Sequence, residues 1–104
     1  MSAMDVACES FSKAKRHIET SQESPRIRVR QAIVRYLIEL HPENFPDGIW
    51  PEFSDLIESV SRAEPEEDEG SVERTLNQMS DKEVDEVIAK IAELEQKVTA
   101  RAKR

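Results

Sequence analysis

The chain has 104 residues, of which 38% are hydrophobic and 36% charged, and its formal net charge is −7. This length predicts one domain with a single modest core, and it leaves little room for a deep, enclosed active site. The net charge disfavours nucleic-acid binding by the whole surface, because phosphates would meet a repulsive field.

The charges are unevenly distributed along the chain. Residues 1–41 carry seven basic and five acidic side chains, whereas residues 42–97 carry five basic and seventeen acidic ones. We therefore expect an acidic surface on the later part of the chain, and a local basic face in the first third stays an open alternative. The acidic surface would steer encounters with a basic protein partner.

The single cysteine and the absence of long apolar segments bear on the cellular compartment of the protein. Its single cysteine, Cys8, cannot form an internal disulfide and fits the reducing cytoplasm. No apolar run approaches membrane-spanning length, and the first residues lack the pattern of a signal peptide. We therefore expect a cytoplasmic protein with no membrane association.

A first helix is predicted over residues 3–22. Its apolar residues recur at spacings of three and four, which places them on one helical stripe: Ala3, Ala7, Phe11, Ala14 and Ile18. Because most of them are alanines, the stripe is thin, and we expect this helix to pack lightly.

A second helix is predicted to begin at Pro25, with Ser24 as its N-cap, and to end at about His41 before Pro42. From Ile27 to Leu40 its apolar residues cover more than half of the helical circumference. Such a helix is expected at the centre of the bundle, with neighbours on most sides.

The basic face of this second helix supports an alternative function. Its arginines are Arg26, Arg28, Arg30 and Arg35. They would contact phosphates in a nucleic-acid-binding regulator of the helix-turn-helix or winged-helix type. Against this reading, the helix after the next turn carries three acids and one base. We favour the interpretation that the arginines form salt bridges with the acidic part of the chain.

The segment "NFPDGIWPEF", residues 44–53, predicts a corner between two helices. Residues 45–48 fit a type I turn that begins at Phe45, and Pro51 favours the first turn of a helix ending at about Ala63. Trp50, Phe53 and Ile57 then have two interpretations. They anchor the helix in a partner's groove, or, as we favour, they fill the chain's own small core.

An acidic linker at residues 63–70 precedes two further helices. The first covers "SVERTLNQM", and the second runs from Asp81 to about Lys103 behind a capping box formed by Ser80 and Glu83. Residues of the last helix repeat at heptad spacing, which is typical of a dimeric coiled-coil seam. These residues are Val84, Val87, Ile91, Leu94 and Val98. The heptad pattern is short, so packing of this helix within its own domain stays an open alternative.

No pattern of catalytic or metal-binding residues is present. The two histidines, His17 and His41, lie on different predicted elements, and neither has a nucleophile or metal-binding motif beside it. We therefore expect no catalytic site, no metal and no cofactor.

The sequence predicts an all-α bundle of four to five helices in one domain over residues 1–104, with ends at 1–4 and 100–104 that need not be ordered. Its expected function is that of a non-enzymatic protein–protein interaction module (an adaptor, regulator or inhibitor) that forms a homodimer.

Overall fold

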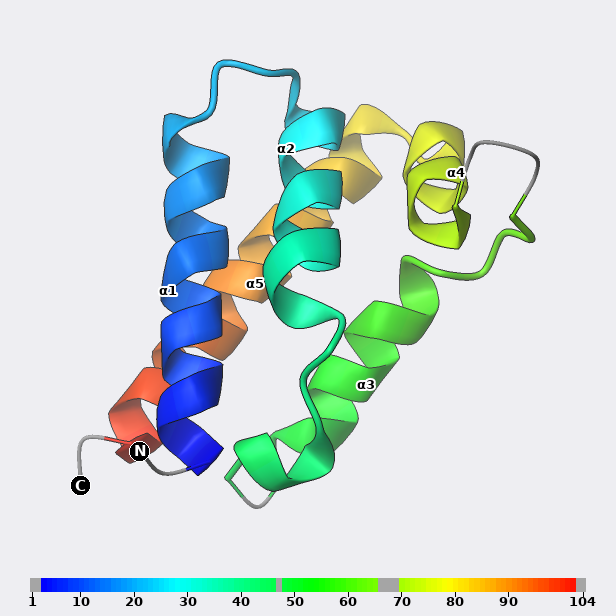
Figure 1. Ribbon diagram of the computed structural model, residues 1–104. Coiled ribbons are helices and arrows are strands. Elements are labelled where there is room, and N and C mark those ends of the chain that lie inside the picture. The colour runs from blue at the N-terminus through cyan, green and yellow to red at the C-terminus, as the bar shows by residue number, and fades with distance from the viewer. Residues whose placement is uncertain (1–2, 47, 66–69, 103–104) are drawn as a thin grey trace.

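The computed structural model describes residues 3–46, 48–65 and 70–102 (Figure 1). This part of the chain forms helices and no strand, which confirms the predicted all-α bundle with a long C-terminal helix. The α-helices are α1 (Ala3–Thr20), α2 (Pro25–Ala32), α3 (Trp50–Ser59), α4 (Ser71–Gln78) and α5 (Asp81–Ala102). A π-helical turn η1 (Ile33–Leu37) continues α2, and a 3-10 turn η2 (Pro42–Asn44) follows it.

The helices are arranged around α5. In Figure 1, α1 and α2 lie side by side, and α5 runs diagonally behind both of them. α5 also contacts α3, and α4 packs against α2. The residues of the core come from all five α-helices, from η1 and from the corner before α3. Asp47, residues 66–69 of the acidic linker, and residues 1–2 and 103–104 of the ends lie outside the described residues.

The first helix packs closely, so the expectation of light packing is wrong. Ala7, Phe11 and Ala14 are fully buried, and α1 makes its most extensive contact with α5. Small side chains let two helices approach each other, so an alanine-rich stripe indicates close packing as readily as a weak contact. Phe11 fills the space that the alanines leave, and its ring lies edge-on to Phe45 and Phe53.

The second helix departs from prediction in its second half. The α-helical pattern ends at Ala32, and η1 follows with the i→i+5 hydrogen bond from Ile38 N–H to Ile33 O, 2.9 Å long. α2 contacts α1, α4 and α5, in agreement with the expected neighbours on most sides. One side is exposed, at Val34 and Ile38.

The corner before α3 is built from aromatic rings. Its turn closes one residue later than predicted, since Ile49 N–H donates to Pro46 O and Gly48 takes the left-handed φ of 86° that favours glycine. The Phe45 ring lies 4.7 Å from the Phe53 ring and 5.4 Å from the Trp50 ring, between centroids. The corner is therefore a part of the core.

Local hydrogen bonds fix the ends of α4 and α5. Ser80 Oγ accepts the Glu83 N–H at 3.1 Å, and Glu83 Oε1 accepts the Ser80 N–H at 3.0 Å, which confirms the predicted capping box. On α4, the buried Thr75 hydroxyl donates to Ser71 O at 2.6 Å and accepts the Ala63 N–H at 2.9 Å. Thr75 thus joins the two ends of the acidic linker.

Candidate functional site

The heptad residues of α5 lie in the core of the single chain. Each is at most 6% exposed. They are Val84, Val87, Ile91, Leu94 and Val98. A coiled-coil seam between two chains at these residues would require α5 to leave its own bundle. Self-association of this fold must therefore use another face.

Three of the four predicted phosphate-binding arginines form hydrogen bonds or ion pairs within the chain. Arg26 donates to Leu76 O and pairs with Asp81 at 3.0 Å, which links the end of α4 to the start of α5. Arg28 Nη1 donates to Ile18 O of α1 at 2.9 Å. Arg30 Nη1 lies 3.9 Å from the Glu73 carboxylate of α4. Arg35 alone of the four is exposed. These contacts favour the structural reading of the basic face.

The predicted docking residues of α3 belong mainly to the core. Phe53 is 1% exposed, while Trp50 and Ile57 are half-buried and pack against the core cluster. The Trp50 ring faces Phe45 and Phe53, with centroid distances of 5.4 and 5.6 Å. The interpretation of these residues as a small core is therefore the one that the packing supports.

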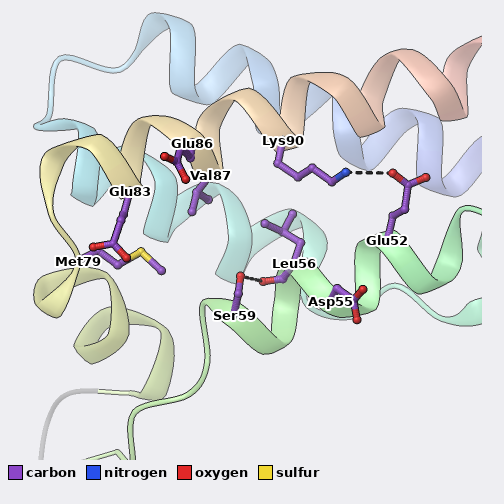
Figure 2. A pocket seen from close by; sticks show the side chains of 9 residues that line it. All are labelled: Glu52, Asp55, Leu56, Ser59, Met79, Glu83, Glu86, Val87 and Lys90. Atoms are coloured by element: carbon purple, nitrogen blue, oxygen red, sulfur yellow. Dashed lines mark hydrogen bonds and ion pairs between the residues drawn. The ribbon is translucent and has the colours of Figure 1, made fainter.

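The opposite side of α3 forms one wall of a groove whose other wall is α5 (Figure 2). We call it the α3–α5 groove. It has a volume of about 410 Å³. Its lining residues are Glu52, Asp55, Leu56, Ser59, Met79, Glu83, Glu86, Val87 and Lys90.

The floor of the α3–α5 groove is apolar. Leu56 from α3 and Val87 from α5 are almost completely buried, and Met79, between α4 and α5, is half-buried. A methionine side chain is flexible and polarisable, so it adapts to differently shaped apolar groups. The floor is therefore suited to receive one apolar side chain of a ligand.

The walls of the groove are acidic. Four carboxylates and one ammonium line it, and Asp55 and Glu86 are exposed without an ion pair to any other described residue. Glu83 is held by the capping box, and the hydrogen bond from Ser80 N–H lowers the pKa of its carboxyl. The groove therefore combines excess negative charge on its walls with an apolar floor.

An ion-pair cluster closes one end of the groove. In Figure 2, Lys90 of α5 reaches across to Glu52 of α3, with Nζ 2.9 Å from Oε1. Lys97 also donates to Glu52, at 2.7 and 3.0 Å, and Glu93 contacts both lysines. Hydrogen bonds from Lys97 first, then Lys90, lower the pKa of Glu52, and the bond to Glu52 raises the pKa of each lysine. All of these groups are thus charged at neutral pH.

The sequence contains a partial signal for this groove. Glu52, Asp55 and Ser59 share one face of α3, and Glu83, Glu86 and Lys90 share one face of α5, by helical spacing. Each acidic face alone is typical of a solvated helix. Only the fold brings the two faces together around an apolar floor.

No further chemical centre is evident in the described residues. In residues 3–46, 48–65 and 70–102, no three His, Cys, Asp or Glu side chains are grouped to hold a metal ion. Across the same ranges, every helix is too short or too polar to cross a membrane. A search against descriptions of protein families found no match, and neither curated proteins nor solved structures yielded a significant similarity.

Proposed function

We propose that this chain is a non-enzymatic protein-interaction module that binds a basic amphipathic segment of a partner protein in the α3–α5 groove. One observation carries the proposal: an apolar floor lies between two walls that both bear carboxylates. A ligand that buries an apolar side chain on the floor would also bring its flanking lysines or arginines against Asp55 and Glu86. A neutral or acidic segment would lose the second contact and meet repulsion.

The dimensions of the groove limit the length of the occupant. Glu52 to Ser59 covers seven residue steps of α3, which corresponds to about 10 Å along the helix axis. This length accommodates about two turns of a helix, with one apolar side chain at the floor and cationic side chains on either side. Contacts of this extent are at the small end of protein interfaces, so we expect a dissociation constant between about 1 and 100 µM.

A designed peptide tests the proposal directly. The probe is a fluorescently labelled amphipathic helix of about 14 residues, a length that exceeds the groove at both ends, with one central Leu flanked by lysines. Binding is measured by fluorescence anisotropy at low and at moderate salt. Two matched peptides serve as ligand controls: one has Glu in place of each Lys, and the other has Ser in place of the Leu. We expect binding of the first probe only, with affinity falling as salt rises.

Matched variants of the protein locate the binding site. Asp55→Asn and Glu86→Gln are expected to weaken binding of the probe several-fold, since each removes a carboxylate that lines the groove. Glu58→Gln and Asp85→Asn remove exposed carboxylates from the same two helices outside the groove and should leave affinity nearly unchanged. Equal losses in both pairs would show a non-specific charge effect and would overturn the assignment of the groove. Absence of probe binding at low salt would overturn the proposed function itself.

A further inference from the structure

A second surface of the molecule carries unpaired apolar area. The exposed large hydrophobic side chains in the described part of the chain are Val6, Val34 and Ile38, which are 39%, 50% and 42% exposed. Val34 belongs to η1, and Ile38 is its C-cap. Val6 lies on α1 and lines the same hollow as Arg35 and Glu39. All three side chains therefore lie at or beside η1. They form one group, whereas exposed apolar residues on a protein surface are normally scattered singly.

The charges beside this apolar surface are self-complementary. Arg35 and Glu39 are exposed, four residues apart, and both face the hollow between η1 and α1. Arg35 belongs to η1 and Glu39 follows its C-cap, and their shared hollow places both on the same flank of this segment. Neither forms an ion pair with another described residue. Glu9 and Lys13 of α1 line the same hollow, but they pair with each other at 3.0 Å. Arg35 and Glu39 are thus left to pair with an inverted copy of the same surface.

We propose that the outer face of η1 binds the same face of a second copy of the chain in antiparallel orientation. We call this surface, which consists of Val34, Arg35, Ile38 and Glu39, the η1 face. A two-fold axis level with Leu37 brings Arg35 of each copy opposite Glu39 of the other. In an antiparallel pair related by such an axis, each flank meets the same flank of its partner, so both ion pairs form.

The apolar residues fit the same register. Because Leu37 lies between Val34 and Ile38 along the chain, the axis at Leu37 makes the Val34 and Ile38 side chains of the two copies alternate along the helix direction. They would form a continuous apolar strip with the two ion pairs on its edge. A parallel pair would turn the Arg35 flank toward the opposite flank of its partner, and the charge pairing would be lost. The charge pattern thus selects the antiparallel arrangement.

The η1 face shares no residue with the α3–α5 groove, so this inference is independent of the proposed function. The apolar strip is short, and an interface of this kind is at the weak end of specific association. We expect a reversible dimer with a dissociation constant between about 10 µM and 1 mM.

Charge exchange at the η1 face provides the test, with sedimentation equilibrium as the measurement. Arg35→Glu places two like charges at both contacts of the homodimer, and so does Glu39→Arg. Each is expected to raise the dissociation constant about tenfold or more. A mixture of the two variants restores opposite charges at both contacts, and so does the double variant within one chain. Both should therefore recover dimer formation.

Control variants make each outcome decisive. Arg62→Glu changes an exposed arginine by the same charge on the loop after α3 and should leave the dimer intact. Val34→Ser with Ile38→Ser should abolish dimer formation, while circular dichroism shows that the helices remain. A wild-type chain that stays monomeric up to about 1 mM would overturn the proposal. Dimers that persist in the double Ser variant, or a charge-variant mixture that does not recover dimer formation, would overturn it as well.

Discussion

Replacement of Leu94 by Ala is expected to lower the free energy of unfolding by about 3 kcal/mol, within the range of buried leucines. Leu94 is fully buried in the middle of α5, so its truncation removes apolar contacts and leaves a cavity. A chain of this length has a total stability of about 5–15 kcal/mol, so the loss is a large fraction of it. With an m value of about 1.5 kcal/mol/M, the urea midpoint should fall by about 2 M.

The measurement is a urea titration followed by far-ultraviolet circular dichroism at two protein concentrations, about tenfold apart. Gln96→Ala is the matched control, because Gln96 is exposed on the same helix and its truncation should change stability by less than about 0.5 kcal/mol. The heptad residues stabilise one chain, so the Leu94→Ala shift should be the same at both concentrations. A shift that grows with dilution, or a variant that loses dimer mass but keeps its stability, would refute the placement of this residue in the intrachain core.

Two predictions concern the ion-pair cluster at the end of the groove. The pKa of Glu52 is lowered by folding, so its contribution to stability is fully present above the ordinary Glu pKa of about 4.3 and is lost as pH falls below it. Stability measured against pH should therefore decline less steeply in acid for Glu52→Gln than for the wild type or for Glu58→Gln, and an unchanged acid slope would contradict the role of Glu52. Lys90 lines the groove and neutralises Glu52, so it competes with a cationic ligand. Lys90→Gln should strengthen probe-peptide binding about two- to fivefold. Lys13→Gln serves as the control, because Lys13 is exposed on α1 and neither lines the groove nor contacts Glu52. An equal gain in that variant would show a general charge effect.

Local patterns in the sequence predicted the elements of this fold well. The stripe through Phe11 located α1, the Ser80–Glu83 box located the start of α5, and Pro51 located the first turn of α3. Each of these signals depends on neighbours within one turn of helix, so the sequence alone contains the information. The predicted ends of α2 and α3 were less accurate, since α2 gives way to η1 after Ala32 and α3 ends at Ser59.

Tertiary relationships explain the remaining differences. A heptad spacing in α5 describes an apolar stripe but does not say which chain covers it, and here the stripe packs on α1, α2 and α3. The exposed side of η1 was invisible for the converse reason, because Val34 and Ile38 are as apolar as their buried neighbours. The α3–α5 groove combines residues from three segments that no sequence period connects. Candidate sites of this kind require the fold.

The two hydrogen bonds of Thr75 have a consequence for how the length of the chain can change. The bond from Ala63 N–H ties the chain before the linker to α4, and α4 also packs against α2, so contacts outside the linker hold α4 in place. Closing a longer loop costs only about 0.6 kcal/mol for each doubling of its length. An inserted peptide or a whole domain between residues 64 and 70 should therefore leave the bundle folded. A second function can thus be added at this linker at a low cost in stability.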